Sequence, residues 1–351
     1  MTDYQPPITL TAQMFTLVAD IGEALGRLSA LADTSQAPML RRGNRIKTIQ
    51  ASLAIENNTL SVEQVTAVLD GQRVLGLPQE IQEVRNAFAA YDAMPQWQPG
   101  RREHLLHAHR LLMHGLIDDA GHFRAGGVGI YRGDRLLHMA PPASRVPDLM
   151  DELLNWASQT DIHPLIASCV FHYEFEFIHP FADGNGRMGR LWQTLMLSQW
   201  RPILAYLPVE TVIYQQQEAY YAALATADQM AESTPFVEFM LAAFQTALDE
   251  AAGKEAKAAS GTAQVTAQVT AQVKRLLLVM ADQSPQGASA LMNQLGLSHR
   301  QSFRISYLVP ALNAGWLEMT DPSSPRSPQQ QYRLSQQGIE WLASIPRSSA
   351  P

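Results

Sequence analysis

The chain has 351 residues, 46% of them hydrophobic, and carries a formal net charge of −7. No apolar run reaches the roughly 20 residues that span a bilayer, so no membrane partner is expected. The single cysteine, Cys169, excludes an intrachain disulfide, and the first residues lack the pattern of a secretory signal. These features predict a cytoplasmic protein of two or three domains.

The charge is unevenly distributed along the chain. Residues 262–351 carry a net charge of +3, which leaves −10 on residues 1–261. An acidic main body disfavours general nucleic-acid binding.

Residues 1–95 are predicted to form an N-terminal helical region. Apolar residues recur at helical spacing in four segments, at 9–32, 38–57, 61–69 and 79–94. The second segment ends at Asn57 and Asn58, which are typical helix stops. Glu56 then lies in the last turn, where the helix dipole disfavours an anion. A solvated glutamate is the simpler interpretation of this residue alone, although a carboxylate in such a place often has a partner elsewhere.

Residues 96–252 are predicted to form a central, mainly helical region. Helices are expected at 101–116, 164–178, 191–200, 215–229 and 234–252. The first of them carries four histidines whose spacing does not converge with a carboxylate, so we interpret them as surface and core residues. Cys169 lies in an apolar helix and is expected to be a core residue. Val128–Tyr131 and Leu136–Met139 flank a Gly-Asp turn, which predicts a β-hairpin within 121–142.

One stretch between two apolar helices concentrates chemically specific side chains: His179-Pro-Phe-Ala-Asp-Gly-Asn-Gly-Arg-Met-Gly-Arg190. Its second helix is expected to begin near Gly186, where unpaired backbone N–H groups and the positive end of the dipole favour phosphates. The arginines supply permanent positive charge, Asp183 is an oxygen ligand suited to Mg²⁺, and His179 can accept a proton.

Two other interpretations of this region were weighed. A short Gly-x-Gly fragment is more often a plain turn than a phosphate site, but six specific positions in twelve residues argue against that here. His172, Glu176 and His179 share a helix face and could alone form a metal-dependent hydrolase site. That site would not explain the residues from Gly184 to Arg190.

The stretch matches without a gap the signature His-x-Phe-x-Asp/Glu-Gly-Asn-Gly-Arg-x-x-Arg, so the chain resembles the Fic (filamentation-induced-by-cAMP) family. The resemblance implies a mainly α fold with N-terminal helices, a helical Fic core and a β-hairpin flap. It also implies a protein adenylyltransferase, which moves AMP from ATP to a Ser, Thr or Tyr hydroxyl of a target protein and releases pyrophosphate.

The resemblance assigns a role to most residues of the stretch. His179 would be the base, Phe181 a core anchor and Asp183 the Mg²⁺ ligand. Gly184, Asn185 and Gly186 would form the phosphate cradle through backbone N–H groups and the Asn amide. Arg187 would contact the phosphates or support the loop, and Arg190 would bind the γ-phosphate.

Three further regions fit the family. Ser52-Leu-Ala-Ile-Glu56-Asn resembles the inhibitory helix motif Ser/Thr-x-x-x-Glu-Gly/Asn, whose glutamate would pair with Arg190. The hairpin at 121–142 resembles the flap that holds the target as an extended segment. Tyr221 would lie near the adenine base, whereas two tyrosines capping the core would be an equally simple explanation. Asp228 stands where the family often has Asn, which leaves its contact with the base in doubt.

Residues 253–273, which end in three Thr-Ala-Gln-Val repeats, are predicted to be a linker. The order of predicted helices and strands in residues 274–346 is typical of a winged helix-turn-helix domain. His299, Arg300 and Arg304 would lie on its recognition helix. Three such groups form a thin basic face, so DNA binding stays open and is not favoured.

The alternatives that remain are a Fic-fold enzyme using another nucleotide and a DNA-binding regulator acting through residues 274–346. Glu56 could also orient a water for removal of AMP. The sequence also leaves open whether the protein forms a homo-oligomer.

Overall fold

The computed structural model describes residues 4–31, 37–132, 135–260, 271–281, 284–297, 303–313, 315–321, 327 and 330–344. The chain divides into two compact units, residues 1–259 and 260–351, and each is described by itself. No described helix is long and apolar enough to cross a membrane.

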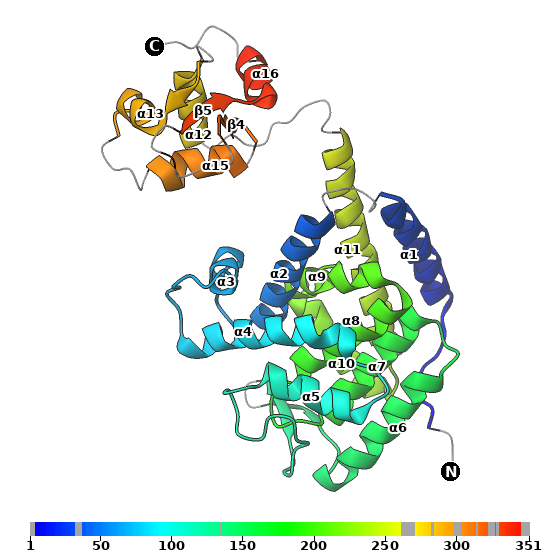
Figure 1. The fold of residues 1–351 in the computed structure, drawn as a ribbon. Helices are drawn as coiled ribbons and strands as arrows, with labels where there is room; N and C mark the ends of the chain where they lie inside the picture. The colour runs from blue at the N-terminus through cyan, green and yellow to red at the C-terminus, as the bar shows by residue number, and fades with distance from the viewer. Residues whose placement is uncertain are drawn as a thin grey trace. The chain divides into compact units, whose positions relative to one another are not determined.

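The first unit is a helical assembly around one hydrophobic core (Figure 1). Its helices are α1 (Ala12–Leu31), α2 (Ala37–Ile55), α3 (Val62–Leu69), α4 (Pro78–Ala93), α5 (Arg102–Leu112), α6 (Val146–Gln159), α7 (Pro164–Ile178), α8 (Asn185–Trp200), α9 (Val209–Gln215), α10 (Gln217–Met230) and α11 (Thr234–Ser260). Three 3₁₀ turns join them, η1 (Met94–Gln96), η2 (Ala143–Arg145) and η3 (Pro202–Tyr206). The mainly α prediction is confirmed, while α6 was not foreseen.

Helix α7 lies at the centre of this unit and packs along α8 on one side and α6 on another. Nearly all of its residues are buried, as expected for a helix that is apolar on every face. Phe171, Phe175 and Trp192 are each fully buried in the same core. The loop from α7 to α8 is therefore carried by two well-packed helices.

Helix α2 brings an N-terminal segment onto this centre, because it packs on α9, α4 and α8. Ile49, Leu53 and Ile55 form its buried stripe. Asn57 adopts a left-handed conformation with φ 68° and ends the helix, as the sequence predicted.

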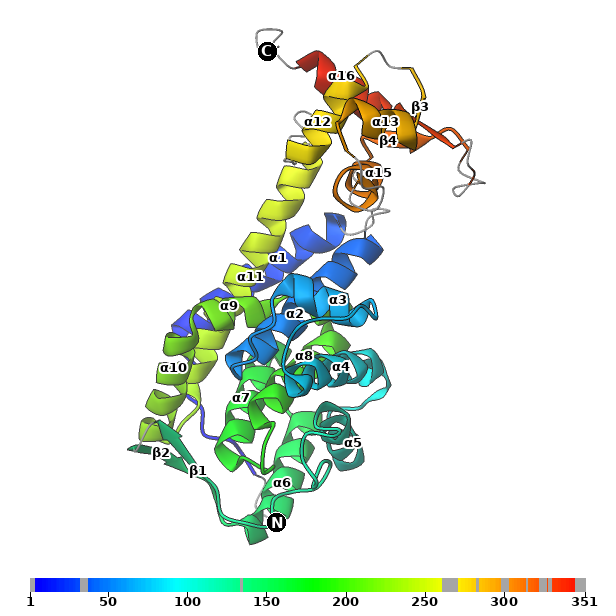
Figure 2. The same cartoon turned by 90° about the vertical axis from the view of Figure 1, so that its left-hand side faces the viewer.

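A two-stranded antiparallel hairpin forms the predicted β element, with β1 (Gly129–Arg132) paired to β2 (Arg135–Met139). Gly129 faces Met139 and Arg132 faces Arg135, while the Gly-Asp turn between the strands lies outside the described residues. Strand β2 lies beside α10, as Figure 2 shows. The hairpin therefore borders the same helix as the site described below.

The second unit has its own core around Leu276, Phe303 and Trp316. Its described elements are α12 (Ala271–Val279), β3 (Gln286–Gly287), α13 (Ala288–Gln294), the π-helical turn η4 (Arg304–Leu308), α15 (Val309–Asn313), β4 (Leu317–Met319), β5 (Gln331–Leu334) and α16 (Gln336–Ser344). The antiparallel sheet has the order β3-β5-β4. Arg304 is exposed, whereas His299 and Arg300 lie outside the described residues. The winged-helix assignment stays a prediction.

Both ends of the segment predicted as a linker, residues 253–273, are helical. Helix α11 continues to Ser260, and α12 begins at Ala271 within the last Thr-Ala-Gln-Val repeat. Residues 251–259 are mostly Ala, Lys and Glu, which are strong helix formers, so local propensity prevails over biased composition. Residues 261–270 lie outside the described part of the chain.

Candidate active site

The loop between α7 and α8 begins at His179, which caps α7 in a left-handed conformation with φ 49° and ψ 61°. Buried Arg124 fixes this unusual backbone by donating hydrogen bonds to the carbonyls of His179 (2.7 Å) and Ile178 (3.2 Å). The same guanidinium donates to the carbonyls of Gly126 (2.8 Å) and Pro141 (2.6 Å), just outside the hairpin. One side chain therefore holds both the histidine backbone and the base of the hairpin.

The middle of the loop is closed by Asn185, whose side chain is buried. Its amide oxygen accepts from the Phe181 N–H and its amide nitrogen donates to the Phe181 carbonyl, both at 2.9 Å. The amide therefore orders the loop, and its contact with phosphates stays a prediction. A phosphate cradle formed by the backbone N–H groups likewise stays a prediction.

His109 of α5 supports the loop from below. Its ring stacks on Phe181 with centroids 3.6 Å apart. The Gly121 N–H donates to Nδ1 (2.8 Å), so Nε2 carries the proton and donates to the carbonyl of Asp183 (3.0 Å). Burial lowers the pKa of His109 to about 4, so the ring is neutral at physiological pH.

The glycines allow the chain to pass close to its neighbours at the start of α8. Gly184 has φ 82°, and a Cβ there would lie 2.6 Å from the sulfur of buried Met113. A Cβ on Gly186 would collide with the Glu56 carboxylate. Met113 and the Glu56 carboxylate therefore lie directly against the start of α8.

Asp183 and Arg187 form an ion pair across the first turn of α8, with Arg187 Nη2 3.2 Å from Asp183 Oδ1. The Asp183 side chain is 60% exposed, whereas that of Arg187 is only 6% exposed. Asp183 also accepts from the N–H of Gly184 at 2.5 Å. An accessible carboxylate at the start of α8 fits a Mg²⁺ ion that takes most of its ligands from phosphates and water.

Arg190 is buried, and α2 supplies its hydrogen-bond acceptors. Its Nε donates to Ser52 Oγ (3.0 Å), and its Nη2 donates to the Ser52 carbonyl (3.0 Å) and to Glu56 Oε1 (2.7 Å). Burial alone would lower the pKa of Arg190, but the Glu56 carboxylate outweighs it and the pKa is raised. The side chains of the two segments, 134 residues apart, are thus joined by a close ion pair.

A cavity of about 230 Å³ opens beside this ion pair. The loop contributes His179, α8 contributes Gly186 and Arg190, and the end of α2 contributes Glu56. Helix α10 contributes Tyr220, Tyr221, Leu224, Ala225 and Asp228. Tyr221 is 41% exposed, and Asp228 accepts from the Tyr173 hydroxyl at 2.9 Å. The structure thus brings Tyr221 to the same cavity as the motif.

The metal-hydrolase alternative does not match the geometry of His172. Its Nδ1 lies 2.8 Å from Gln193 Oε1 and its Nε2 lies 3.3 Å from the Tyr220 hydroxyl. Within the described part of the chain, no three His, Cys, Asp or Glu side chains are grouped to hold a metal ion. We interpret His172 as a structural residue behind the cavity.

Comparison with known proteins identifies the family. Residues 99–197 match the Fic/DOC family, and residues 271–335 match the C-terminal domain of filamentation-induced-by-cAMP Fic-like proteins. A crystal structure of a Fic family protein from Desulfovibrio desulfuricans is 59% identical, with a TM-score of 0.73, over 95% of this chain and 99% of that one. The chain belongs to the Fic family.

Curated Fic relatives resemble part of this protein. The protein adenylyltransferase Fic of Aedes aegypti is 29% identical over 63% of this chain and 45% of its own length. The corresponding protein of Drosophila mojavensis is 28% identical over 66% of this chain and 46% of its own length. The chain therefore spans less than half the length of these relatives.

Two residues of the site were missed or undervalued from the sequence. The sequence did not distinguish His109 from the three other histidines near it. Its stacking on Phe181 and its hydrogen bond to Asp183 become visible only in the folded structure. Arg124 was given no role from the sequence. A polar residue in an otherwise apolar face of a predicted helix, such as His109, was the only available signal.

Proposed function

We propose that this Fic protein transfers AMP from ATP to a hydroxyl group of a target protein. The observation that carries the proposal is the cavity of about 230 Å³, which unites His179, Gly186 and Arg190 with Tyr221. It supplies a proton acceptor, a helix N-terminus, a buried arginine and an aromatic ring in one place. The names of the adenylyltransferase relatives support the same reaction.

The residues define where each part of the nucleotide would bind. The N–H groups of Gly184–Gly186 at the start of α8 would hold the phosphates, and Arg190 would take the terminal phosphate. The aromatic ring of Tyr221 would cover the base. Asp183 would hold a Mg²⁺ ion, which when bound neutralises phosphate charge and supports departure of pyrophosphate.

His179 would perform the proton transfer. Its imidazole accepts the proton of the target hydroxyl as that oxygen forms a bond to the α-phosphorus. The bond between the α-phosphorus and the oxygen bridging to the β-phosphate breaks, and pyrophosphate leaves. The N–H groups of α8 and Arg190 stabilise the charge that develops. Arg124 keeps the left-handed backbone of His179 in place during the reaction.

The target would approach along the hairpin. Strands β1 and β2 form a sheet of only two strands, whose backbone edge can pair with an extended segment. The hairpin lies beside α10, which lines the cavity, and its base is held by Arg124. A hydroxyl on the bound segment would thus be presented near His179.

Glu56 would keep the isolated protein inactive, because it occupies Arg190 and lines the cavity where the phosphates would bind. A pose of ATP that avoids Glu56 would misplace the α-phosphate.

The position of the transferred label tests this function. Glu56→Gly protein is incubated with a lysate and ATP labelled on either the α- or the γ-phosphate. The proposal predicts that labelling above the level given by Glu56→Gly/His179→Ala appears with the α-label and not with the γ-label. Labelling from the γ-phosphate that is lost in Glu56→Gly/His179→Ala would show a kinase-like reaction and would overturn the proposal.

A further inference from the structure

Arg187 has an electrostatic environment that the motif alone does not explain. It lies in the first turn of α8, where the helix dipole disfavours a cation, and its side chain is only 6% exposed. Two carboxylates compensate this buried charge. Asp183 Oδ1 lies 3.2 Å from Arg187 Nη2, and Oε1 of Glu83, a residue of α4, lies 3.6 Å from Arg187 Nη1.

The two carboxylates differ in accessibility. The Asp183 side chain is 60% exposed, and the proposed reaction needs it for Mg²⁺. The Glu83 side chain is 14% exposed and faces the interior. When Asp183 binds a cation, Glu83 is the carboxylate that keeps its ion pair with Arg187. A buried guanidinium without a counterion is strongly unfavourable, so Glu83 holds a necessary position.

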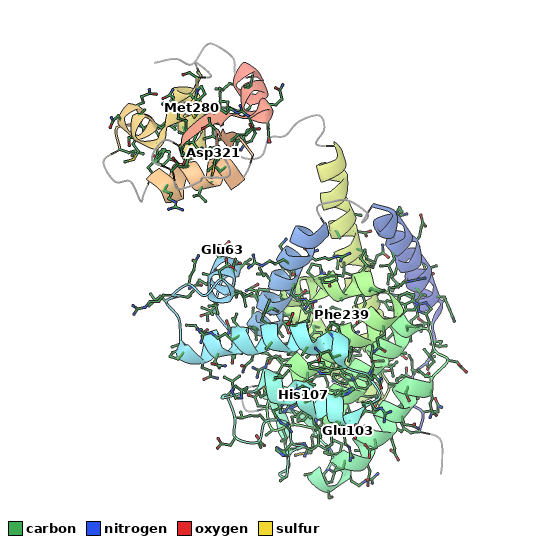
Figure 3. All side chains as sticks on the ribbon, viewed as in Figure 1. Glu63, Glu103, His107, Phe239, Met280 and Asp321 are labelled. Atoms are coloured by element: carbon green, nitrogen blue, oxygen red, sulfur yellow. The ribbon has the colours of Figure 1, made fainter. Side chains whose placement is uncertain are left out.

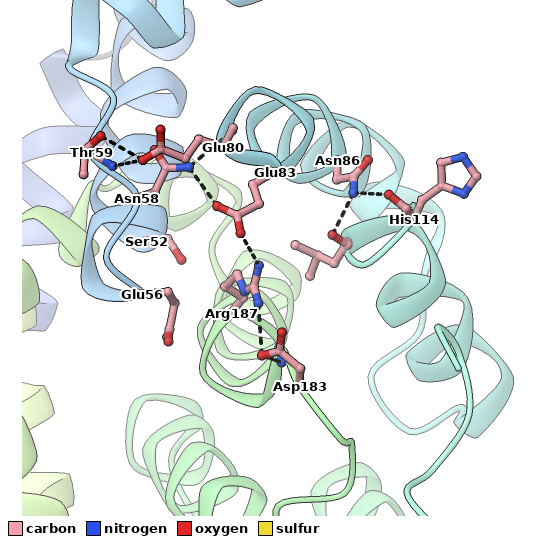
Figure 4. A network of polar contacts seen from close by, with 12 residues as sticks. Ser52, Glu56, Asn58, Thr59, Glu80, Glu83, Asn86, His114, Asp183 and Arg187 are labelled. Atoms are coloured by element: carbon pink, nitrogen blue, oxygen red, sulfur yellow. Dashed lines mark hydrogen bonds and ion pairs between the residues drawn. The ribbon is translucent and has the colours of Figure 1, made fainter. Parts of the chain in front are cut away.

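The other oxygen of Glu83 contacts the end of α2. Its Oε2 accepts from the side-chain amide of Asn58 at 2.8 Å, and the same amide nitrogen donates to the Glu80 carbonyl at 3.2 Å. Figure 4 shows the resulting series of contacts from Asp183 through Arg187 and Glu83 to Asn58.

Asn58 belongs to the turn that terminates the helix bearing Glu56. The Asn57 N–H bonds to the Ala54 carbonyl (3.0 Å) and the Asn58 N–H bonds to the Leu53 carbonyl (3.1 Å). With Asn57 left-handed, this is the Schellman arrangement, and Glu56 is its C-cap residue. The buried Asn58 side chain therefore fixes the turn from which Glu56 reaches Arg190.

We propose that Glu83 is a positioning residue for Arg187, and that through Asn58 it joins the catalytic loop to the end of the inhibitory helix. This inference rests on the proposed function. One oxygen of Glu83 keeps the motif's first arginine in place while Asp183 binds its cation. The other keeps the Glu56 turn docked. In the Glu56→Gly background, where docking of α2 no longer inhibits, removing the charge of Glu83 therefore lowers transfer. With Glu56 present, removing the Asn58 amide raises it.

The first test needs no nucleotide. Thermal unfolding is measured for Asp183→Asn, Glu83→Gln and the double variant. Each single variant leaves Arg187 one carboxylate, so the double variant should lose at least about 3 °C more than the sum of the single shifts. The matched control combines Asp183→Asn with Glu103→Gln, a substitution at an exposed position of α5 (Figure 3). The unfolding temperature of that double variant should shift by the sum of the two single shifts. Additive shifts for Glu83 would overturn the positioning role.

The second test measures transfer from α-labelled ATP. In the Glu56→Gly background, Glu83→Gln should lower kcat/KM for ATP about 10-fold, while Glu103→Gln leaves it unchanged. Asn58→Ala should raise basal transfer several-fold when Glu56 is present and have no effect in Glu56→Gly. An unchanged kcat/KM for Glu83→Gln, or an unchanged basal rate for Asn58→Ala, would refute the corresponding half of the proposal.

The two tests separate this inference from the proposed function. If Glu56→Gly transfers no α-label, the function is wrong, and the unfolding cycle still decides whether Glu83 holds Arg187. If Glu56→Gly transfers the α-label and the unfolding shifts of Asp183→Asn and Glu83→Gln are additive, the proposed function is supported and the role of Glu83 is refuted.

Discussion

Arg190 Nη2 lies 2.7 Å from Glu56 Oε1, so the last turn of α2 places a carboxylate on the buried arginine of α8. The Arg190 side chain is 1% exposed and that of Glu56 is 35% exposed. The arginine is thus fixed in the core, while the glutamate is the more accessible partner. A ligand that offers Arg190 a better anion, such as a phosphate, can displace Glu56 without moving Arg190.

Ser52 should contribute to inhibition independently of Glu56. Its hydroxyl accepts from Arg190 Nε, and Ser52→Ala removes that acceptor while keeping the backbone carbonyl. One lost hydrogen bond to a charged group weakens docking of α2 and should raise basal AMP transfer about 5-fold. The rate is measured with α-labelled ATP against Ser158→Ala, an exposed change on α6. Equal basal rates for the two variants would show that Ser52 does not hold the helix.

Tyr221 should contribute to nucleotide affinity through its ring. In the Glu56→Gly background, Tyr221→Ala should weaken ATP binding about 10-fold, while Tyr221→Phe retains most of it, because stacking needs only the aromatic face. Titration with a fluorescent ATP analogue measures both. Tyr214→Ala is the matched control, since Tyr214 is similarly exposed and lies outside the cavity lining. Equal affinities for Tyr221→Ala and Tyr214→Ala would place the base elsewhere.

Arg124 should be essential to the shape of the loop. Its planar guanidinium donates to four carbonyls in three segments, which a lysine ammonium cannot do with the same geometry. Arg124→Lys should lower the free energy of unfolding by about 3 kcal/mol and reduce transfer in parallel. Denaturant unfolding measures the loss, with the exposed change Arg73→Lys as the control. A loss no greater than that of Arg73→Lys would contradict the role given to Arg124.

His109 should make stability depend on pH. Burial lowers its pKa from 6.5 to about 4, so between these values the unfolded chain binds a proton that the folded protein does not. Its contribution to the free energy of unfolding is therefore present above pH 6.5 and lost by pH 4, and amounts to about 3 kcal/mol.

The wild-type curve alone would not isolate His109, because buried Glu210 acts with the opposite sign. Burial raises the pKa of Glu210 to about 7, so its contribution falls as the pH rises from 4.5 to 7. The informative quantity is the difference in unfolding free energy between wild type and His109→Gln. That difference should shrink on acidification from pH 6.5 to 4, and a constant difference would contradict the assignment.

The sequence was sufficient to predict the loop because its side chains and glycines are adjacent in the chain. His179 to Arg190, the flanking helices and the hairpin could all be derived from local pattern and the family resemblance. The pairing of Glu56 with Arg190 required the resemblance, because helical periodicity alone favoured a solvated glutamate. The hydrogen bonds from Arg190 to Ser52 were not predicted.

The remaining features depend on tertiary packing that periodicity does not encode. The stacking of His109 on Phe181 and the contact of Glu83 with Arg187 join segments that are distant in the chain. The bonds of the Asn185 amide to Phe181 could not be predicted, because the resemblance gives residue types without their local hydrogen bonds. The helical stretch at 253–260 was missed because biased composition was given more weight than propensity.

The competition for Arg190 is tested most directly by the rate of α-label incorporation in Glu56→Gly relative to wild type, with Glu63→Gly, an exposed glutamate of α3, as the control. Removing a charged hydrogen bond from a buried arginine predicts a rate about 10- to 100-fold above wild type for Glu56→Gly and no change for Glu63→Gly. Equal incorporation by Glu56→Gly and wild type would contradict the account.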